Sequence, residues 1–136
     1  TVINKKPLFI VDGAHNAGAA DKMAESIRHY FNGKKLIYIM GVFADKEYKI
    51  VLEKTAHFAE KIYTIETPDN PRALPAEELA KAARVYNSSA ESTKSIKDAV
   101  EKAFSCAGDD ENSVILAFGS LSFIGALTDA VEEYVG

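Results

Sequence analysis

The sequence predicts an α/β domain, a Rossmann-like three-layer sandwich in which helices cover both faces of a mostly parallel sheet. Two observations support this fold class. Short apolar runs rich in β-branched residues alternate with longer segments whose apolar residues recur every three or four positions. The apolar runs lack a polar alternation, which is typical of parallel strands buried on both faces. With 136 residues, the chain has room for one domain, 1–136, with a substantial core.

Four apolar runs are predicted to form the core strands, because each is short and is bounded by polar or glycine-containing segments. They are residues 8–11, 36–40, 61–65 and 113–118. The segment 87–95 is polar and rich in serine, so we expect a loop or a very short edge strand there. Right-handed crossovers would join the parallel strands.

Five segments have the apolar spacing of amphipathic helices. Asp45 is placed to cap the second, because its carboxylate can accept an unpaired amide of the first turn. Pro75 is placed to open the third, and the prolines before it predict an irregular loop. The predicted helices cover about 16–31, 46–58, 75–86, 96–107 and 123–135.

Composition excludes several classes of function. The formal charge of −4 and the lack of a cation cluster argue against a nucleic-acid partner. Cys106 is the single cysteine, which excludes an internal disulfide, and we interpret it as an inert residue near a helix end. Three histidines without paired spacing predict no metal site. No apolar run reaches the roughly 20 residues of a membrane span, and no signal peptide is evident, so we expect a cytoplasmic protein without a membrane partner.

Three predicted strand ends carry unusual polar residues: 12–16, 41–46 and 119–122. Ligands of open α/β sheets bind beyond such carboxyl ends. Asp12 can accept hydrogen bonds from a ribose diol, and His15 stands at a helix N-terminus. Helix dipoles there favour a neutral imidazole, which can donate one hydrogen bond to a phosphate or carboxylate oxygen. The alternative is that Asp12 and Asn16 only cap the helix and that His15 fills a turn.

The segment Asp12-Gly13-Ala14-His15-Asn16, directly after a hydrophobic strand, resembles the signature that opens the C-terminal domain of folylpolyglutamate synthase and bifunctional dihydrofolate synthase, in the Mur ligase superfamily. Three further matches follow in the family's order and extend the resemblance over essentially the whole chain. They are Gly41 through Asp45-Lys46-Glu47, Pro71-Arg72-Ala73-Leu74, and Gly119-Ser120. The sequence departs from the family pattern at Ala17, where proline is frequent, and at Ser122, where tyrosine is frequent.

The resemblance implies an ATP-dependent ligase that adds L-glutamate to folate or dihydropteroate. ATP would phosphorylate a substrate carboxylate, and the glutamate amine would then attack the acyl phosphate. The chain contains no G-x-x-x-x-G-K-[ST] motif, so the P-loop and the magnesium ligands would belong to an N-terminal domain absent from this chain. Thr1 would then lie near an interdomain linker. The isolated domain is expected to be inactive and monomeric.

The same resemblance assigns roles to five residues. Asp12 would hold the ATP ribose, with His15 and Asn16 on the nucleotide side, and His15, the candidate catalytic residue, would reach toward the phosphates. Lys46 and Ser120 are candidates for binding the incoming glutamate, through an ammonium charge and a hydroxyl. The alternatives are a solvated surface charge for Lys46 and a helix cap for Ser120.

Other interpretations stay open. Arg72 could face substrate, although a contact with nearby carboxylates that braces its loop is favoured. The C-terminal domain of a Mur-type cell-wall ligase fits the histidine-containing signature less well. A nucleotide-binding α/β module without catalysis of its own is compatible with the missing P-loop. A response-regulator receiver would need an acidic cluster after the first predicted strand, where only Asp12 is found.

Overall fold

The computed structural model describes residues 1–44 and 47–136. Within these residues, six strands form one sheet in the order β1-β2-β6-β3-β4-β5. All neighbouring strands are parallel except β1 and β2, which are antiparallel. The strands are β1 (Val2–Lys5), β2 (Leu8–Val11), β3 (Lys35–Gly41), β4 (Lys61–Thr64), β5 (Ala90–Ser92) and β6 (Ser113–Gly119).

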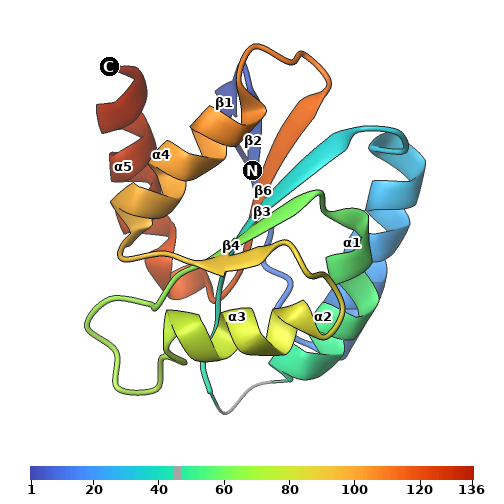
Figure 1. The fold of residues 1–136 in the computed structure, drawn as a ribbon, viewed down its shortest axis with the longest axis vertical. Helices are drawn as coiled ribbons and strands as arrows, with labels where there is room; N and C mark the ends of the chain where they lie inside the picture. Colours follow the sequence, from blue (N-terminus) through green and yellow to red (C-terminus); the bar gives the residue numbers. More distant parts are fainter. Residues whose placement is uncertain (45–46) are drawn as a thin grey trace.

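Helices cover both faces of this sheet (Figure 1), which confirms the predicted three-layer sandwich. On one face, α1, α2 and α3 pack over one apolar core, and on the other face α4 and α5 pack over a second. The helices in the described ranges are α1 (Ala17–Tyr30), α2 (Tyr48–Thr55), α3 (Ala76–Arg84), α4 (Ile96–Ala107) and α5 (Ile124–Val135). None of them is long and apolar enough to span a bilayer.

The central strand β3 shows why the core runs are continuously apolar. Leu36, Tyr38 and Met40 belong to the core under α1–α3, whereas Ile37 and Ile39 belong to the core under α4 and α5. Successive side chains of a strand point to opposite faces, so a strand covered on both sides needs apolar residues at every position. All seven residues of β6 are likewise buried.

Two elements differ from the prediction, and a third takes one of the two forms expected for it. The strand β1 was not predicted, because it lies at the sheet edge and carries polar residues instead of a continuous apolar run. The second predicted helix ends early: α2 stops at Thr55 and a 3₁₀ turn, Ala56–Phe58, follows. The polar segment 87–95 contains the short edge strand β5, one of the two forms expected for it. Asp45, the predicted cap of the second helix, lies outside the described residues.

The sheet topology places three loops side by side. Val11 of β2 pairs with Ala117 of β6, and Gly41 of β3 pairs with Gly119 of β6. Because β6 lies between β2 and β3, the segment after Gly119 is flanked by residues 12–16 on one side and 42–44 on the other. These are the three strand ends that the sequence singled out.

Candidate functional site

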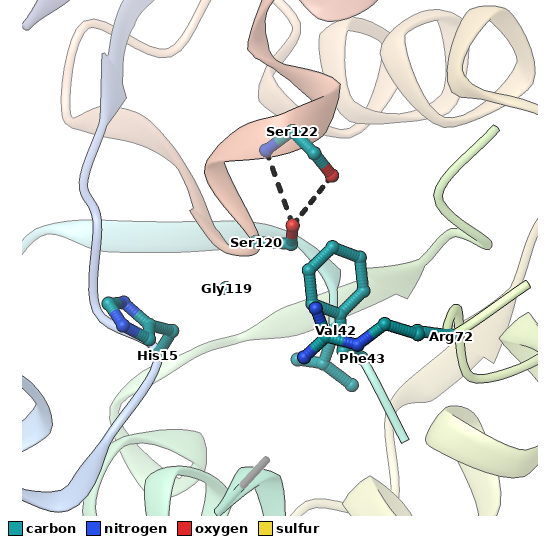
Figure 2. A pocket seen from close by; sticks show the side chains of 7 residues that line it. All are labelled: His15, Val42, Phe43, Arg72, Gly119, Ser120 and Ser122. Atoms are coloured by element: carbon teal, nitrogen blue, oxygen red, sulfur yellow. Dashed lines mark hydrogen bonds between the residues drawn. The ribbon is translucent and has the colours of Figure 1, made fainter. Parts of the chain in front are cut away.

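A cavity of about 310 Å³ opens at this carboxyl edge of the sheet (Figure 2). The loops after β2, β3 and β6 and the loop before α3 all contribute to it. The lining residues are His15, Val42, Phe43, Arg72, Gly119, Ser120 and Ser122. Figure 2 shows His15 on one side of the cavity and Arg72 with Phe43 on the other. A partly apolar pocket with a few convergent polar groups has the composition of a small-molecule site.

Asp12 organises the turn that follows β2. Its backbone amide donates to the Ala117 carbonyl at 2.9 Å, which continues the pairing with β6. Its side-chain oxygen Oδ1 accepts the Ala14 amide at 2.9 Å, and Ala14 is fully buried. The Asp12 carboxylate therefore fixes the turn that carries His15 to the cavity.

The ring of His15 is held by its own turn. Nδ1 lies 2.7 Å from the Gly13 carbonyl oxygen. A carbonyl oxygen only accepts, so Nδ1 carries the proton, and in the neutral ring Nε2 is then an acceptor. The predicted hydrogen bond from a neutral imidazole to an anion does not fit this arrangement, because only the imidazolium form can donate from Nε2.

Asn16 has the capping role that the sequence left as an alternative. Its Oδ1 accepts the Ala19 amide at 2.9 Å, and its extended backbone is that of an N-cap. The next amide, of Ala17, donates to Glu47 Oε1 at 3.3 Å. This contact ties the start of α1 to the N-cap residue of α2. Proline, which is frequent in the family at position 17, has no amide hydrogen. Ala17 has one and can therefore make this contact with Glu47.

Two loops pair with each other to form the far wall of the cavity. Phe43 and Ala73 form an antiparallel bridge, and the Ala44 amide donates to the Arg72 carbonyl at 2.8 Å. The Asn70 side chain accepts the Arg72 amide at 2.9 Å. The Arg72 guanidinium lies 4.6 Å from the Phe43 ring centre, a cation–π distance. Backbone pairing braces this loop, and the Arg72 side chain lies in the cavity wall.

Ser120 is held by contacts to its backbone and its side chain. Its amide donates to the Gly41 carbonyl at 2.7 Å, and its Oγ accepts the Ser122 amide at 3.2 Å. The two hydroxyl oxygens of Ser120 and Ser122 are 2.7 Å apart. Ser120 therefore caps the short 3₁₀ turn Leu121–Phe123 and lines the cavity at the same time, so its two interpretations are both compatible with the structure.

The structure brings His15 and Ser120 together in one cavity, with Asp12 and Asn16 shaping the turn beside it. Lys46 lies outside the described residues. The cavity also contains Val42, Phe43 and Ser122, which were not selected as site residues. In the described ranges, no group of three or more His, Cys, Asp or Glu side chains is arranged to hold a metal ion.

The sequence matches known proteins over most of its length. Residues 1–121 match the family model of the Mur ligase glutamate ligase domain. Dihydrofolate synthase/folylpolyglutamate synthase of Bacillus subtilis is 28% identical over 123 residues, which are 90% of this chain and 27% of that protein. Folylpolyglutamate synthase of Lacticaseibacillus casei is 30% identical over 73 residues, 54% of this chain and 17% of that protein. The matched part of this chain thus spans only 17% to 27% of the length of these relatives.

Solved structures share the fold. The chain of E. coli FolC in complex with DHPP and ADP superposes with a TM-score of 0.84 at 19% identity, over 100% of this chain and 31% of that one. Folylpolyglutamate synthase of Mycobacterium tuberculosis, complexed with ADP and AMPPCP, gives 0.79 at 23% identity, over 99% and 31%. Folylpolyglutamate synthase of Thermotoga maritima gives 0.73 at 26% identity, over 92% and 28%. The family match over residues 1–121 shows that the chain belongs to the Mur ligase family, as a glutamate ligase domain.

Proposed function

We propose that this chain is the C-terminal domain of an ATP-dependent ligase that joins L-glutamate to folate or dihydropteroate. The parent enzyme would be a folylpolyglutamate synthase, a dihydrofolate synthase or both. The observation that carries the proposal is the cavity at the carboxyl edge of the sheet. It collects His15, Arg72 and Ser120 from three of the four segments that resemble the family. The relatives named above, which carry these two enzyme names, support the same substrate class.

The nucleotide would lie along the turn after β2. Asp12 uses Oδ1 within the turn, and its carboxylate lies at the tip of a buried strand, where a ribose diol can donate to it. His15, whose Nδ1 is held by the Gly13 carbonyl, would direct the Nε2 side of its ring toward the phosphates. Asn16 would keep the α1 N-terminus fixed beside it. The complex of a related protein with ADP and AMPPCP supports a nucleotide as a ligand of the parent enzyme.

Glutamate would lie deeper in the cavity. The Arg72 guanidinium is a planar fork of N–H donors, a shape that matches a carboxylate, and it lies over the Phe43 ring. The Ser120 hydroxyl would add one hydrogen bond from the opposite loop. Lys46 stays a candidate for a second carboxylate contact.

The reaction has two steps. A folate or pteroate carboxylate oxygen attacks the γ-phosphorus of ATP, forming an acyl phosphate and releasing ADP. The glutamate nitrogen then attacks the acyl carbon, the amide bond forms, and the bond to phosphate breaks. A P-loop domain elsewhere in the longer protein would bind the triphosphate and hold magnesium, as the resemblance to the family implies. The present chain would bind the glutamate and form one wall of the nucleotide site.

The experiment uses the full-length protein that contains this chain. It should form ADP only when ATP, glutamate and a folate or dihydropteroate acceptor are all present, and mass spectrometry should show the acceptor heavier by one glutamyl group. His15→Ala should lower turnover at least about tenfold, the scale of one lost polar contact in the transition state. His29→Ala, in the exposed last turn of α1, is the matched control and should keep wild-type kinetics.

Two outcomes would contradict this proposal. Absence of glutamate-dependent ADP release with every folate acceptor would exclude a folate ligase. Activity confined to a cell-wall peptide precursor would favour a Mur-type enzyme instead.

The cytoplasmic location and the monomeric state remain predictions from the sequence. The monomeric state is checked by light scattering of the full-length protein.

A further inference from the structure

The hydroxyl of Ser120 has a hydrogen-bond arrangement that restricts what it can offer a ligand. A serine hydroxyl has one donor hydrogen and two acceptor lone pairs. The Ser122 amide donates to Ser120 Oγ at 3.2 Å and occupies one lone pair. The Ser122 hydroxyl lies 2.7 Å from the same oxygen, and either hydroxyl can be the donor of that bond. The direction of this second bond decides whether Ser120 presents a donor or an acceptor to the cavity.

We propose that Ser122 is a positioning residue, whose hydroxyl donates to Ser120 and so leaves Ser120 with only its own O–H to offer an anionic oxygen of the substrate. This inference rests on the proposed function, in which the cavity binds the carboxylate of glutamate. With both of its lone pairs occupied by Ser122, Ser120 would donate to a carboxylate oxygen and would itself offer no acceptor to an N–H or O–H group.

The surroundings of the pair favour this direction. Ser120 is only 8% exposed, and Val42 and Phe43 line the wall beside it, whereas Ser122 is exposed, so the bond between the two hydroxyls is partly buried. Figure 2 shows Arg72 in the same cavity. An anionic oxygen bound in the cavity would attract the positive end of the Ser120 O–H dipole. A chain in which Ser122 donates to Ser120 and Ser120 donates to the anion is cooperatively polarised, which strengthens both bonds.

The removal of one hydroxyl tests this role without dismantling the site. Ser122→Ala deletes only the side-chain donor and keeps the backbone amide that holds Ser120 Oγ. In the full-length ligase we expect the KM for glutamate to rise about three- to tenfold, the scale of one lost hydrogen bond, with kcat and the KM for ATP within about twofold of wild type. Ser122→Thr retains the hydroxyl and should restore the KM.

A double-mutant cycle separates positioning from a general structural role. In a Ser120→Ala background, Ser122→Ala should add no further increase in the KM for glutamate, because the hydroxyl that it positions is gone. Ser26→Ala, an exposed serine on α1, is the control and should match wild type.

Three results would overturn the inference: an unchanged KM in Ser122→Ala, no rescue by threonine, or additive effects in the cycle. Each of these requires a wild-type enzyme that ligates glutamate. The absence of that activity would instead refute the proposed function, so the two failures are distinguishable.

Discussion

The carbonyl oxygen of Gly41 accepts the amide hydrogen of Ser120 at 2.7 Å, which joins the carboxyl ends of β3 and β6 by a backbone bond beyond the sheet. Gly119, the last residue of β6 and the one directly before Ser120, has φ of +112°, a conformation that residues with a side chain rarely adopt. A Cβ on Gly119 would also overlap the Gly41 carbonyl oxygen. The position of the cavity's serine is therefore set by the backbone at two glycines.

Gly119→Ala should lower stability and displace Ser120. The added methyl group meets backbone, which cannot move aside as a flexible side chain can, and the φ value itself is strained. We expect the free energy of unfolding to fall by about 2 kcal/mol or more, measured by urea titration. In the full-length ligase, the KM for glutamate should rise as well.

Gly125→Ala is the matched control for this substitution. Gly125 lies in α5, and a Cβ there would meet no atom within 4 Å. Gly125 is the second residue of α5, where alanine costs less than glycine, so this variant should match wild type or be more stable by up to about 0.5 kcal/mol. If Gly119→Ala were as stable as wild type, the close approach of the two strand ends would be disproved.

Tyr38→Phe should destabilise the core through a single lost hydrogen bond. The Tyr38 hydroxyl donates to the Thr55 carbonyl at 2.7 Å and links the central strand to the end of α2. Burial raises the pKa of Tyr38 far above its ordinary value, which reflects how little water reaches the hydroxyl. Loss of the donor leaves a buried carbonyl with one partner fewer, at a cost of about 1–2 kcal/mol in the free energy of unfolding.

The control for Tyr38→Phe is Tyr30→Phe. Tyr30 is 70% exposed at the end of α1, so its hydroxyl is solvated in both the folded and unfolded states. Its removal should change the free energy of unfolding by less than about 0.5 kcal/mol. Equal effects of the two substitutions would mean that the Tyr38 hydrogen bond contributes nothing specific.

The sequence predicted those elements whose own residues have a clear apolar pattern. The continuous apolar run 36–40 predicted a strand covered on both faces, and β3 confirms it. The strand β1 escaped prediction because Val2–Lys5 pairs only at the sheet edge, so its residues need not be apolar at every position. β1 pairs with β2, which follows it directly in the chain, but the polar residues of β1 give no continuous apolar signal for a strand.

The same distinction holds for the site. His15 and Ser120 follow predicted strands directly, and the carboxyl edge of a parallel sheet brings such positions together. The cation–π contact of Arg72 with Phe43 depends on the pairing of two irregular loops 30 residues apart, for which no periodicity exists. The hydroxyl pair of Ser120 and Ser122 required the geometry of a 3₁₀ turn.

Asp12→Asn should separate the folding role of Asp12 from its proposed role toward ATP. An asparagine oxygen can still accept the Ala14 amide, so the turn and the thermal stability should be retained. The amide lacks the negative charge and the second strong acceptor that a ribose diol would use. We expect the KM for ATP in the full-length enzyme to rise about tenfold, the scale of one charged hydrogen bond, with little change in the KM for glutamate.

Asp12→Ala completes this comparison, because it removes the turn contact as well. It should lower the midpoint of thermal unfolding, which Asp12→Asn should leave within about a degree of wild type, because a lost turn contact costs stability on the order of 1 kcal/mol. A wild-type KM for ATP in Asp12→Asn would disprove the proposed contact of Asp12 with the ribose, and Asp12 would then act only in the turn.

Glu91 should make the stability of the sheet edge depend on acidity. Its carboxylate accepts hydrogen bonds from Lys102 at 2.9 Å and lies 3.0 Å from the Lys61 ammonium, joining β5 to α4 and β4. Hydrogen bonds from Lys102 and Lys61 hold the pKa of Glu91 below its ordinary value of 4.5, and the bond from Lys102 has the larger effect. A carboxylate whose folded-state pKa is depressed contributes stability above its unfolded pKa, and this contribution is lost as the pH falls through the folded value.

The thermal midpoint of the wild-type protein should therefore fall as the pH decreases from 6 to about 3. The midpoint of Glu91→Gln should fall less over the same range. Glutamine cannot form the ion pairs, so the variant should be the less stable protein at pH 6, and the two curves should converge in acid. Glu25→Gln, an exposed position on α1, is the control and should follow the wild-type curve. Parallel curves for wild type and Glu91→Gln across this range would show that the ion pairs of Glu91 do not couple stability to protonation.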